Sequence, residues 1–149
     1  MCGYAQIAER ESPTKATLCE LYQHPEQYVG KMVSVRARVA GNDLSIDAFE
    51  QKTCSSWMNV LVIFPEQVKP APGFSLLLDD SLTKLLKSVR EGKGVQATFE
   101  GRFDVAFVWR DHKRIPVGTH PGYGKKNRYD ARIVLHRVSD VLVLPGSRL

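Results

Sequence analysis

Alternation between apolar and polar residues from position 95 to position 109 is the feature that most constrains the fold of this chain. The apolar residues share one parity: Val95, Ala97, Phe99, Phe103, Val105, Phe107 and Trp109. The polar residues of the other parity are Gln96, Thr98, Glu100, Arg102 and Asp104. Successive side chains of a strand point to opposite faces, so the segment is predicted to be one long strand with one buried face.

Three shorter strand-like segments precede this one. Residues 33–39 and 44–49 alternate apolar with polar side chains, and a Gly-Asn-Asp turn separates them. Residues 57–64 are apolar on both parities, which predicts a strand covered on both faces. We expect Phe74 and residues 76–78, in the long connection that follows, to supply this cover.

Two helices are predicted. Thr17 and Glu20 have the T-x-x-E spacing of a capping box, which predicts a short helix near the N-terminus. Ser81 is the expected N-cap of a second helix that ends near Glu91. Its apolar residues recur at helical spacing: Leu82, Leu85, Leu86 and Val89.

The resulting order is three strands, a helix and two strands, with residues 129–144 as the closing strand. This is the element order of an OB-type barrel. We therefore predict a mainly β protein, a five-stranded OB-like barrel with a short N-terminal helix. Residues 17–149 are expected to form a single domain after a flexible leader over residues 1–16. Barrels of this type have many unrelated functions, so the fold alone does not assign one.

Positive charge is concentrated in the second half of the chain. The protein has 21 Lys and Arg against 16 Asp and Glu, a net charge of +5. Residues 1–80 carry a net charge of −3 and residues 81–149 carry +8. This asymmetry favours an anionic partner. No segment approaches the roughly 18 consecutive apolar residues of a membrane-spanning helix, so no transmembrane segment is expected.

Basic and aromatic residues are interleaved in this second half. They are Arg102, Trp109, Arg110, Lys113, Arg114, Tyr123, Lys125, Lys126, Arg128, Tyr129 and Arg132. OB-type barrels bind oligonucleotides partly through the loop after the fourth strand, and residues 110–128 occupy that position. The candidate ligand-binding residues of this loop are Arg110, Lys113, Arg114, Tyr123, Lys125, Lys126 and Arg128.

In such a site Lys and Arg contact phosphates while Tyr123 or Tyr129 stacks on a base. The alternative interpretation is a solvated Lys-rich loop, which many soluble domains carry. Arg36 and Arg38 are expected to lie on a solvated face of the first strand.

No catalytic or metal-binding motif is recognisable. The four histidines lack HExxH or paired-ligand spacing, and Asp111, His112 and His120 form at best a loose set on a loop. No serine lies in a G-x-S-x-G turn. We therefore expect a protein that is not an enzyme, with no cofactor and no metal.

The three cysteines bear on the cellular compartment in which the protein is expected. Cys2, followed by Gly3 and a polar stretch, is typical of a bacterial lipoprotein after removal of its signal peptide, although no charged and apolar leader precedes it in this sequence. Cys2 is therefore a candidate lipidation site. Cys19 and Cys54 are both expected to face the core, either as a disulfide formed in an oxidising compartment or as two buried thiols.

Several short motifs, spread over most of the chain, carry a resemblance to a known group of proteins. They are Thr17-Leu18-Cys19-Glu20-Leu21, Pro25, Tyr28, Gly30-Lys31, Val33 to Val39, Cys54, Trp57, Glu100-Gly101-Arg102-Phe103, Ala131-Arg132-Ile133-Val134 and Arg137-Val138-Ser139-Asp140-Val141. On these residues the chain resembles a poorly characterised group of small bacterial envelope proteins with an OB-like core. The resemblance implies export and a disulfide between Cys19 and Cys54, and it implies no catalytic residues. The second strand, LSIDAFE, departs from the tyrosine-aspartate ending expected of such proteins.

Two functions are predicted on these grounds. The first is a non-enzymatic OB-fold binding or interaction module of the bacterial cell envelope, periplasmic or anchored to a membrane by a lipid. Its expected partner is an anionic ligand or an envelope protein. The alternative is a cytoplasmic protein that binds single-stranded nucleic acid through residues 110–128.

Overall fold

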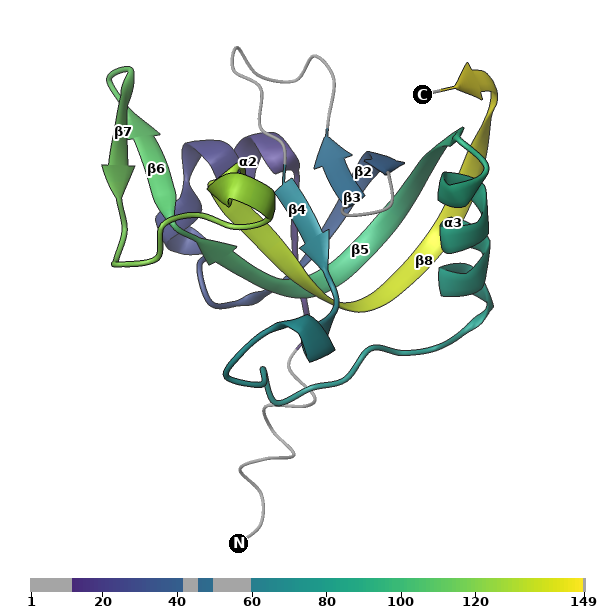
Figure 1. Cartoon of the computed structure of the whole chain (residues 1–149), viewed down its shortest axis with the longest axis horizontal. Coiled ribbons are helices and arrows are strands. Elements are labelled where there is room, and N and C mark those ends of the chain that lie inside the picture. The colour runs from purple at the N-terminus through teal and green to yellow at the C-terminus, as the bar shows by residue number, and fades with distance from the viewer. Residues whose placement is uncertain (1–11, 42–45, 50–59, 149) are drawn as a thin grey trace, which may run out of the picture.

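The computed structural model describes residues 12–41, 46–49 and 60–148 of the 149-residue chain. The strands are β1 (Thr14–Ala16), β2 (Met32–Gly41), β3 (Ile46–Phe49), β4 (Val60–Ile63), β5 (Lys93–Val105), β6 (Phe107–Arg110), β7 (Lys113–Pro116) and β8 (Ala131–Arg148). The helices are α2 (Leu18–Gln23) and α3 (Asp80–Arg90), with 3₁₀ turns η1 (Pro25–Gln27), η2 (Pro65–Gln67) and η3 (Lys125–Asn127). The prediction of a mainly β protein is confirmed (Figure 1).

One mixed sheet contains β1, β2, β3, β4, β8 and β5. Strand β2 pairs with β1 in parallel and with both β3 and β5 in antiparallel orientation. Strand β4 is antiparallel to β3 and parallel to β8, and β8 is antiparallel to β5. The pairings therefore lead from β2 through β3, β4, β8 and β5 back to β2. Strands β6 and β7 form a separate two-stranded sheet that projects at the end of the molecule opposite α3 (Figure 1).

The main core lies between the inner faces of these strands. The parity predicted for β5 is confirmed, because the apolar side chains from Val95 to Phe103 are fully buried. Phe103 belongs to the same cluster as Ile133, Leu135 and Val138 of β8, all at 0% exposure. Helix α3 adds Leu82 and Leu85, so its apolar stripe is buried as expected.

The prediction that one strand runs to Trp109 is wrong. Strand β5 ends at Val105, where it pairs with Ala131, the first residue of β8. Beyond this point β8 offers no partner, and the chain continues as β6, which pairs with β7 instead. Residues Asp111 and His112 connect the two with φ angles of 51° and 64°, the left-handed pair that tight hairpin turns require. Trp109 is consequently 40% exposed rather than buried.

The caps of the two helices show one confirmation and one correction. The Thr17 hydroxyl accepts from the Glu20 amide at 3.0 Å, and the Glu20 carboxylate accepts from the Thr17 amide at 2.9 Å, so the predicted capping box is present. Helix α3 is capped by Asp79 rather than by Ser81, because Asp79 Oδ1 accepts from the Leu82 amide at 3.0 Å. The N-cap therefore lies two residues earlier than predicted, and the helix begins at Asp80.

The structure also corrects the expected start of the first strand and the residues expected to pack over β4. Residues 14–16, assigned to the leader, form β1, while residues 1–11 lie outside the described residues. The predicted strand over 57–64 is described as β4 from Val60, and both of its faces are buried. Its outer residue Leu61 is covered by Ala106, Tyr123 and Tyr129. In the connection at 74–78, Leu76 packs against the main core cluster, which includes Val60 and Val62, whereas Leu78 is 81% exposed.

Gly101 marks a close approach of β5 and β8. A β-carbon at this position would overlap the carbonyl oxygen of Val134 and lie 2.7 Å from Ile133 Cγ2. The register between the two strands also shifts between Glu100 and Gly101. A residue without a side chain is therefore needed where the strands cross.

Candidate functional site

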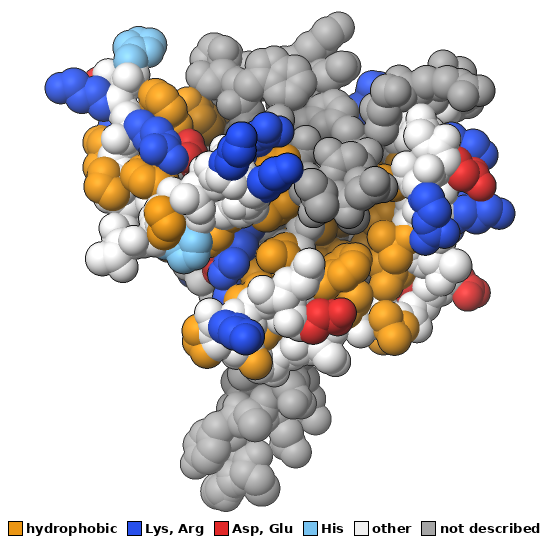
Figure 2. Space-filling model, in the orientation of Figure 1, with side chains coloured by type: hydrophobic (Ala, Val, Ile, Leu, Met, Phe, Trp, Pro, Cys, Tyr) orange, Lys and Arg blue, Asp and Glu red, His pale blue; other side chains and the backbone are white. Residues whose placement is uncertain are grey.

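The connection between β5 and β8, residues 106–130, carries all seven predicted ligand-binding residues. It consists of the β6–β7 hairpin, an irregular segment and η3. Lys and Arg side chains gather over the hairpin and over η3 on the face shown in Figure 2. Which of these cations are available to a ligand depends on their existing partners.

Arg114, although exposed, is paired with Asp130. Its Nε and Nη2 atoms donate to Asp130 Oδ1 at 3.0 and 2.8 Å, and its guanidinium lies 3.6 Å from the centroid of the Phe107 ring. The Trp109 indole donates to the other oxygen, Asp130 Oδ2, at 2.9 Å. Asp130 thus fastens both strands of the hairpin to the start of β8, and this use of Arg114 does not fit the predicted ligand contact.

Arg110 is also paired. Its Nη2 atom donates to Glu26 Oε1 at 3.0 Å and to Oε2 at 2.9 Å, which links β6 to η1. The pKa of Glu26 is lowered mainly by a backbone hydrogen bond. Desolvation opposes this, and the charge of Arg110 and its hydrogen bond lower the pKa further. Two of the six predicted cations are therefore neutralised by carboxylates.

The other four cations remain exposed: Lys113, Lys125, Lys126 and Arg128. No carboxylate in the described ranges lies within ion-pair distance of any of them. Three of them belong to or adjoin η3, where Lys126 has a φ of 57° and turns the chain tightly. The η3 segment thus presents three unneutralised positive charges within four residues, and Lys113 adds one on the hairpin.

Tyr123 does not fit the stacking role expected of it. It is 6% exposed, and Tyr129 is 5% exposed. The backbones of the two tyrosines pair through hydrogen bonds of 2.8 and 3.0 Å, and both rings pack in the cluster that covers Leu61. Desolvation raises the pKa of Tyr123, and the charge of Asp104 adds to this effect while Arg132 and Arg102 oppose it. The ring is part of the cover of β4.

Beneath Tyr123 lies a cluster that the sequence pattern did not single out. Arg102 donates from Nε and Nη2 to the two carboxylate oxygens of Asp104 at 2.8 and 2.9 Å. Arg132 donates from Nε to Asp104 Oδ2 at 2.8 Å and lies 4.4 Å from the centroid of the Tyr123 ring. The side chains of Arg102, Asp104 and Arg132 are 26%, 15% and 15% exposed.

The alternation in β5 did place Arg102 and Asp104 together on the outer face. The sequence did not reveal the register between β5 and β8, which sets Asp104 opposite Arg132. The hydrogen bond to Asp104 is the main cause that raises the pKa of Arg102, against the opposing effect of desolvation. Two guanidinium groups face one carboxylate, so the cluster carries one positive charge in excess.

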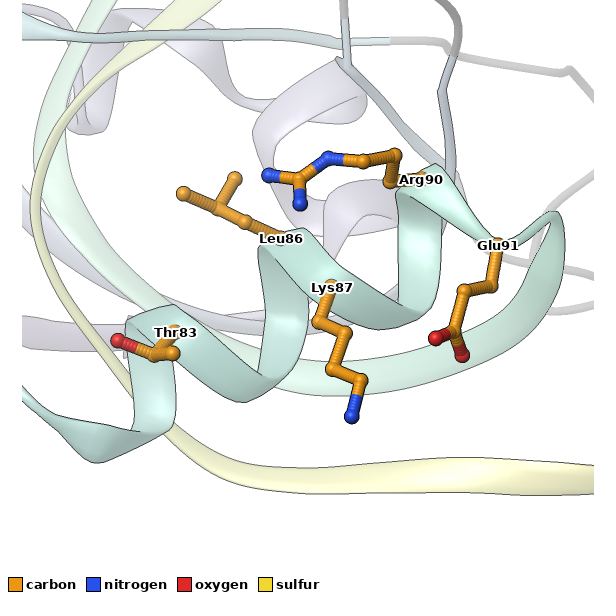
Figure 3. A pocket seen from close by; sticks show the side chains of 5 residues that line it. All are labelled: Thr83, Leu86, Lys87, Arg90 and Glu91. Carbon is orange, nitrogen blue, oxygen red and sulfur yellow. The ribbon is translucent and has the colours of Figure 1, made fainter.

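Other candidate sites are weaker. Among the described residues, no three His, Cys, Asp or Glu side chains are placed to bind a metal ion. Figure 3 shows a shallow pocket of about 390 Å³ on α3, lined by Thr83, Leu86, Lys87, Arg90 and Glu91. It lies at the opposite end of the molecule from the 106–130 connection (Figure 1).

The predicted sites at cysteines are only partly described. Cys19 is buried at 7% exposure, in agreement with the expectation that it faces the core. Cys2 and Cys54 lie outside the described residues, so the lipidation site and the Cys19–Cys54 disulfide stay predictions.

Comparisons with known proteins assign no family: no family model matches the chain, and no curated protein matches it significantly. In the part of the chain that the structure describes, neither helix has the length and apolar character needed to cross a bilayer.

Proposed function

We propose that this protein is a non-enzymatic binding module with an OB-like barrel, and that its 106–130 connection binds an anionic ligand. The observation that carries the proposal is the contrast among the cations of this connection. Arg110 and Arg114 are neutralised by Glu26 and Asp130, whereas four others have no carboxylate partner in the described residues. Unneutralised surface charges attract an anionic partner from solution.

The OB-like assignment is supported by the order of pairing. The five strands β2, β3, β4, β5 and β8 pair in a circuit, with α3 inserted between β4 and β5. In an OB-type barrel, the loop after the fourth strand flanks the ligand-binding face. The 106–130 connection follows β5, which is the fourth of these five strands in chain order.

Single-stranded nucleic acid is the second candidate and a narrower one. Exposed Trp109 favours it, because an aromatic ring beside cations is the combination that binds bases and phosphates together. Buried Tyr123 would have to leave its packing before it could stack. The envelope location is supported only by the resemblance noted above.

The experiment is a salt titration of binding, followed by fluorescence anisotropy, with a labelled oligothymidine and a labelled sulfated oligosaccharide as separate ligands. The triple variant Lys125→Ala, Lys126→Ala, Arg128→Ala should bind both ligands more weakly. On oligothymidine its salt slope should fall by about 2, since each lost contact to a single strand lowers the slope by about 0.7.

A matched control is available on α3. Lys84→Ala, Lys87→Ala, Arg90→Ala removes the same residue types from a helix at the far end of the molecule. It should leave both affinities unchanged. Equal losses in the two triple variants would reduce the effect to net charge, and absence of binding to both ligands at low salt would overturn the proposal. Binding of oligothymidine alone would select the nucleic-acid candidate.

A further inference from the structure

We propose that Arg102 and Arg132, oriented by Asp104, form a subsite for a single phosphate group on the outer face of β5 and β8. The proposal rests on the anion-binding function proposed above and names a specific group and its ligands within it. It differs from that function in placing the specific contact on the sheet rather than on the exposed loop.

The geometry leaves the ends of both guanidinium groups open. Arg102 uses its Nε and Nη2 atoms on Asp104, and Arg132 uses only Nε. The nitrogens Nη1 of Arg102 and Nη1 and Nη2 of Arg132 have no bonded partner among the described residues. No buried side-chain nitrogen in that part of the chain lacks a hydrogen bond, so these open ends reach solvent.

The two guanidinium groups meet at one carboxylate oxygen. Arg102 Nη2 and Arg132 Nε both bond to the same atom, Asp104 Oδ2, at 2.9 and 2.8 Å. The planar Tyr123 ring lies against Arg132 and limits its movement. Guanidinium groups fixed in this way present several donors to one tetrahedral anion without first losing side-chain freedom.

The electrostatics favour an anion over a neutral ligand. One carboxylate neutralises only one of the two guanidinium groups, and partial burial strengthens the remaining charge relative to a fully exposed lysine. A singly charged phosphate group, such as a phosphodiester or the phosphate monoanion, would balance the one excess positive charge that Asp104 leaves.

The subsite adjoins the exposed cations. Tyr123 contacts Arg132, and the next residue, Gly124, lies against Leu61, which is paired in register with Arg132. η3 begins one residue later and lies over the start of β8 (Figure 1). A ligand with several phosphates can therefore contact the Arg102–Arg132 pair and the η3 cations at once.

The test uses the folded full chain and NMR signals of the arginine Nε–H groups during titration with inorganic phosphate and, separately, with a thymidine dinucleotide. The Nε–H signals of Arg102 and Arg132 should shift saturably with phosphate, and equal ionic strength of sodium chloride should not shift them. If the signals saturate with inorganic phosphate but not with the dinucleotide, the natural ligand is free phosphate. If the affinities for the two probes are comparable, the natural ligand is a phosphodiester backbone. Failure of both signals to shift with either ligand would overturn the subsite.

Variants separate orientation from charge. Arg132→Lys keeps the charge and loses the planar donor fork, so phosphate affinity should fall about tenfold. Asp104→Asn removes a negative charge and replaces one of the two acceptor oxygens with an NH2 donor, so it can no longer orient both arginines. It should therefore also weaken binding, and tighter binding would contradict a positioning role. Lys93→Gln, at the other end of β5, removes one charge and should have no effect.

The two proposals fail differently. The η3 triple variant should keep the phosphate-induced shifts while it loses affinity for the polymers. Persisting polymer binding with no response to phosphate removes the subsite and leaves the proposed function. Saturable phosphate binding without binding of oligothymidine or the sulfated oligosaccharide would contradict the proposed function and leave the phosphate subsite standing.

Discussion

Among single residues, Tyr123 is the one whose surroundings most clearly oppose ionisation. Its ring is buried in the cluster with Leu61 and lies 4.4 Å from the guanidinium of Arg132. Burial and the nearby charge of Asp104 raise the pKa of the phenol above its ordinary value of about 10. The folded state therefore holds this proton at a pH where the unfolded chain has released it.

We predict that Tyr123→Phe makes the free energy of unfolding less sensitive to pH at alkaline pH. A group with a raised folded-state pKa stabilises the fold below its unfolded pKa, and this contribution is lost as pH rises through the folded value. Between pH 8 and about 11 the unmodified protein should therefore lose more stability than the variant. Thermal unfolding across this range measures the difference. In a pH titration followed by phenolate absorbance, the step at the highest pH should be missing from Tyr123→Phe.

Tyr28→Phe is the control, since it removes a phenol from a different part of the fold. Parallel stability curves for the protein and the Tyr123→Phe variant would contradict the raised pKa.

Residue identity alone did not reveal which cations are already paired. The sequence analysis treated Arg110 and Arg114 as ligand contacts because they lie in a basic loop. Their partners, Glu26 and Asp130, are 84 and 16 positions away along the chain. Local patterns carry no information about pairs at such separations, whereas burial of Phe103 followed directly from its parity in the strand.

Among the elements, the β6–β7 hairpin depends most on side-chain hydrogen bonds. All four residues of β7 are exposed, and its backbone pairs only with β6. The Asp130 carboxylate accepts three bonds from Trp109 and Arg114 of the hairpin. The hairpin therefore has little buried apolar surface of its own to keep it in place.

We predict that Asp130→Ala loosens the hairpin without affecting the main sheet. Amides of β6 and β7 should exchange with solvent about tenfold faster, because each lost hydrogen bond contributes about 1 kcal/mol. Amides of β5 and β2 should be unchanged. Hydrogen exchange measured by NMR gives both values in one sample.

Glu26→Gln is the matched comparison, since it releases the hairpin from η1 at an exposed ion pair and should have a smaller effect. Unchanged exchange in β6 and β7 of Asp130→Ala would show that backbone bonds alone hold the hairpin.

Elements with strong local signals were predictable, and those defined by tertiary pairing were not. The Thr17–Glu20 capping box and the apolar repeat of α3 are encoded within a few residues. The end of β5 is not, because the alternation continues through Phe107 and Trp109 while β8 begins only at Ala131. The hairpin turn was missed because Asp111-His112 lacks the glycine that usually marks such turns.

At the scale of the whole molecule, β8 joins the two sides of the sheet. It pairs with β4 on one edge and with β5 on the other, so the circuit of strands depends on it. It also contributes Ile133, Leu135 and Val138, each fully buried. Burial of three such side chains contributes about 1.5–3 kcal/mol each, which is comparable to the total stability of a small domain.

We therefore predict that a chain ending at Asp130 does not fold. It should show no cooperative thermal transition by circular dichroism and should bind a hydrophobic dye. A chain ending at Leu144 keeps the pairs from Ala131 to Val143 and should retain a cooperative transition. A cooperative transition in the shorter chain would mean that β2–β5 pairing and α3 form an independent unit.

The crossing at Gly101 has an evolutionary consequence. Since the Val134 carbonyl occupies the space of any β-carbon there, drift at this position is blocked for as long as β5 and β8 keep their register. Exposed cations such as Lys125 and Lys126 carry no such steric constraint. Descendants of this protein can therefore exchange these cations freely, whereas a descendant with alanine at position 101 must have separated the two strands or shifted their register.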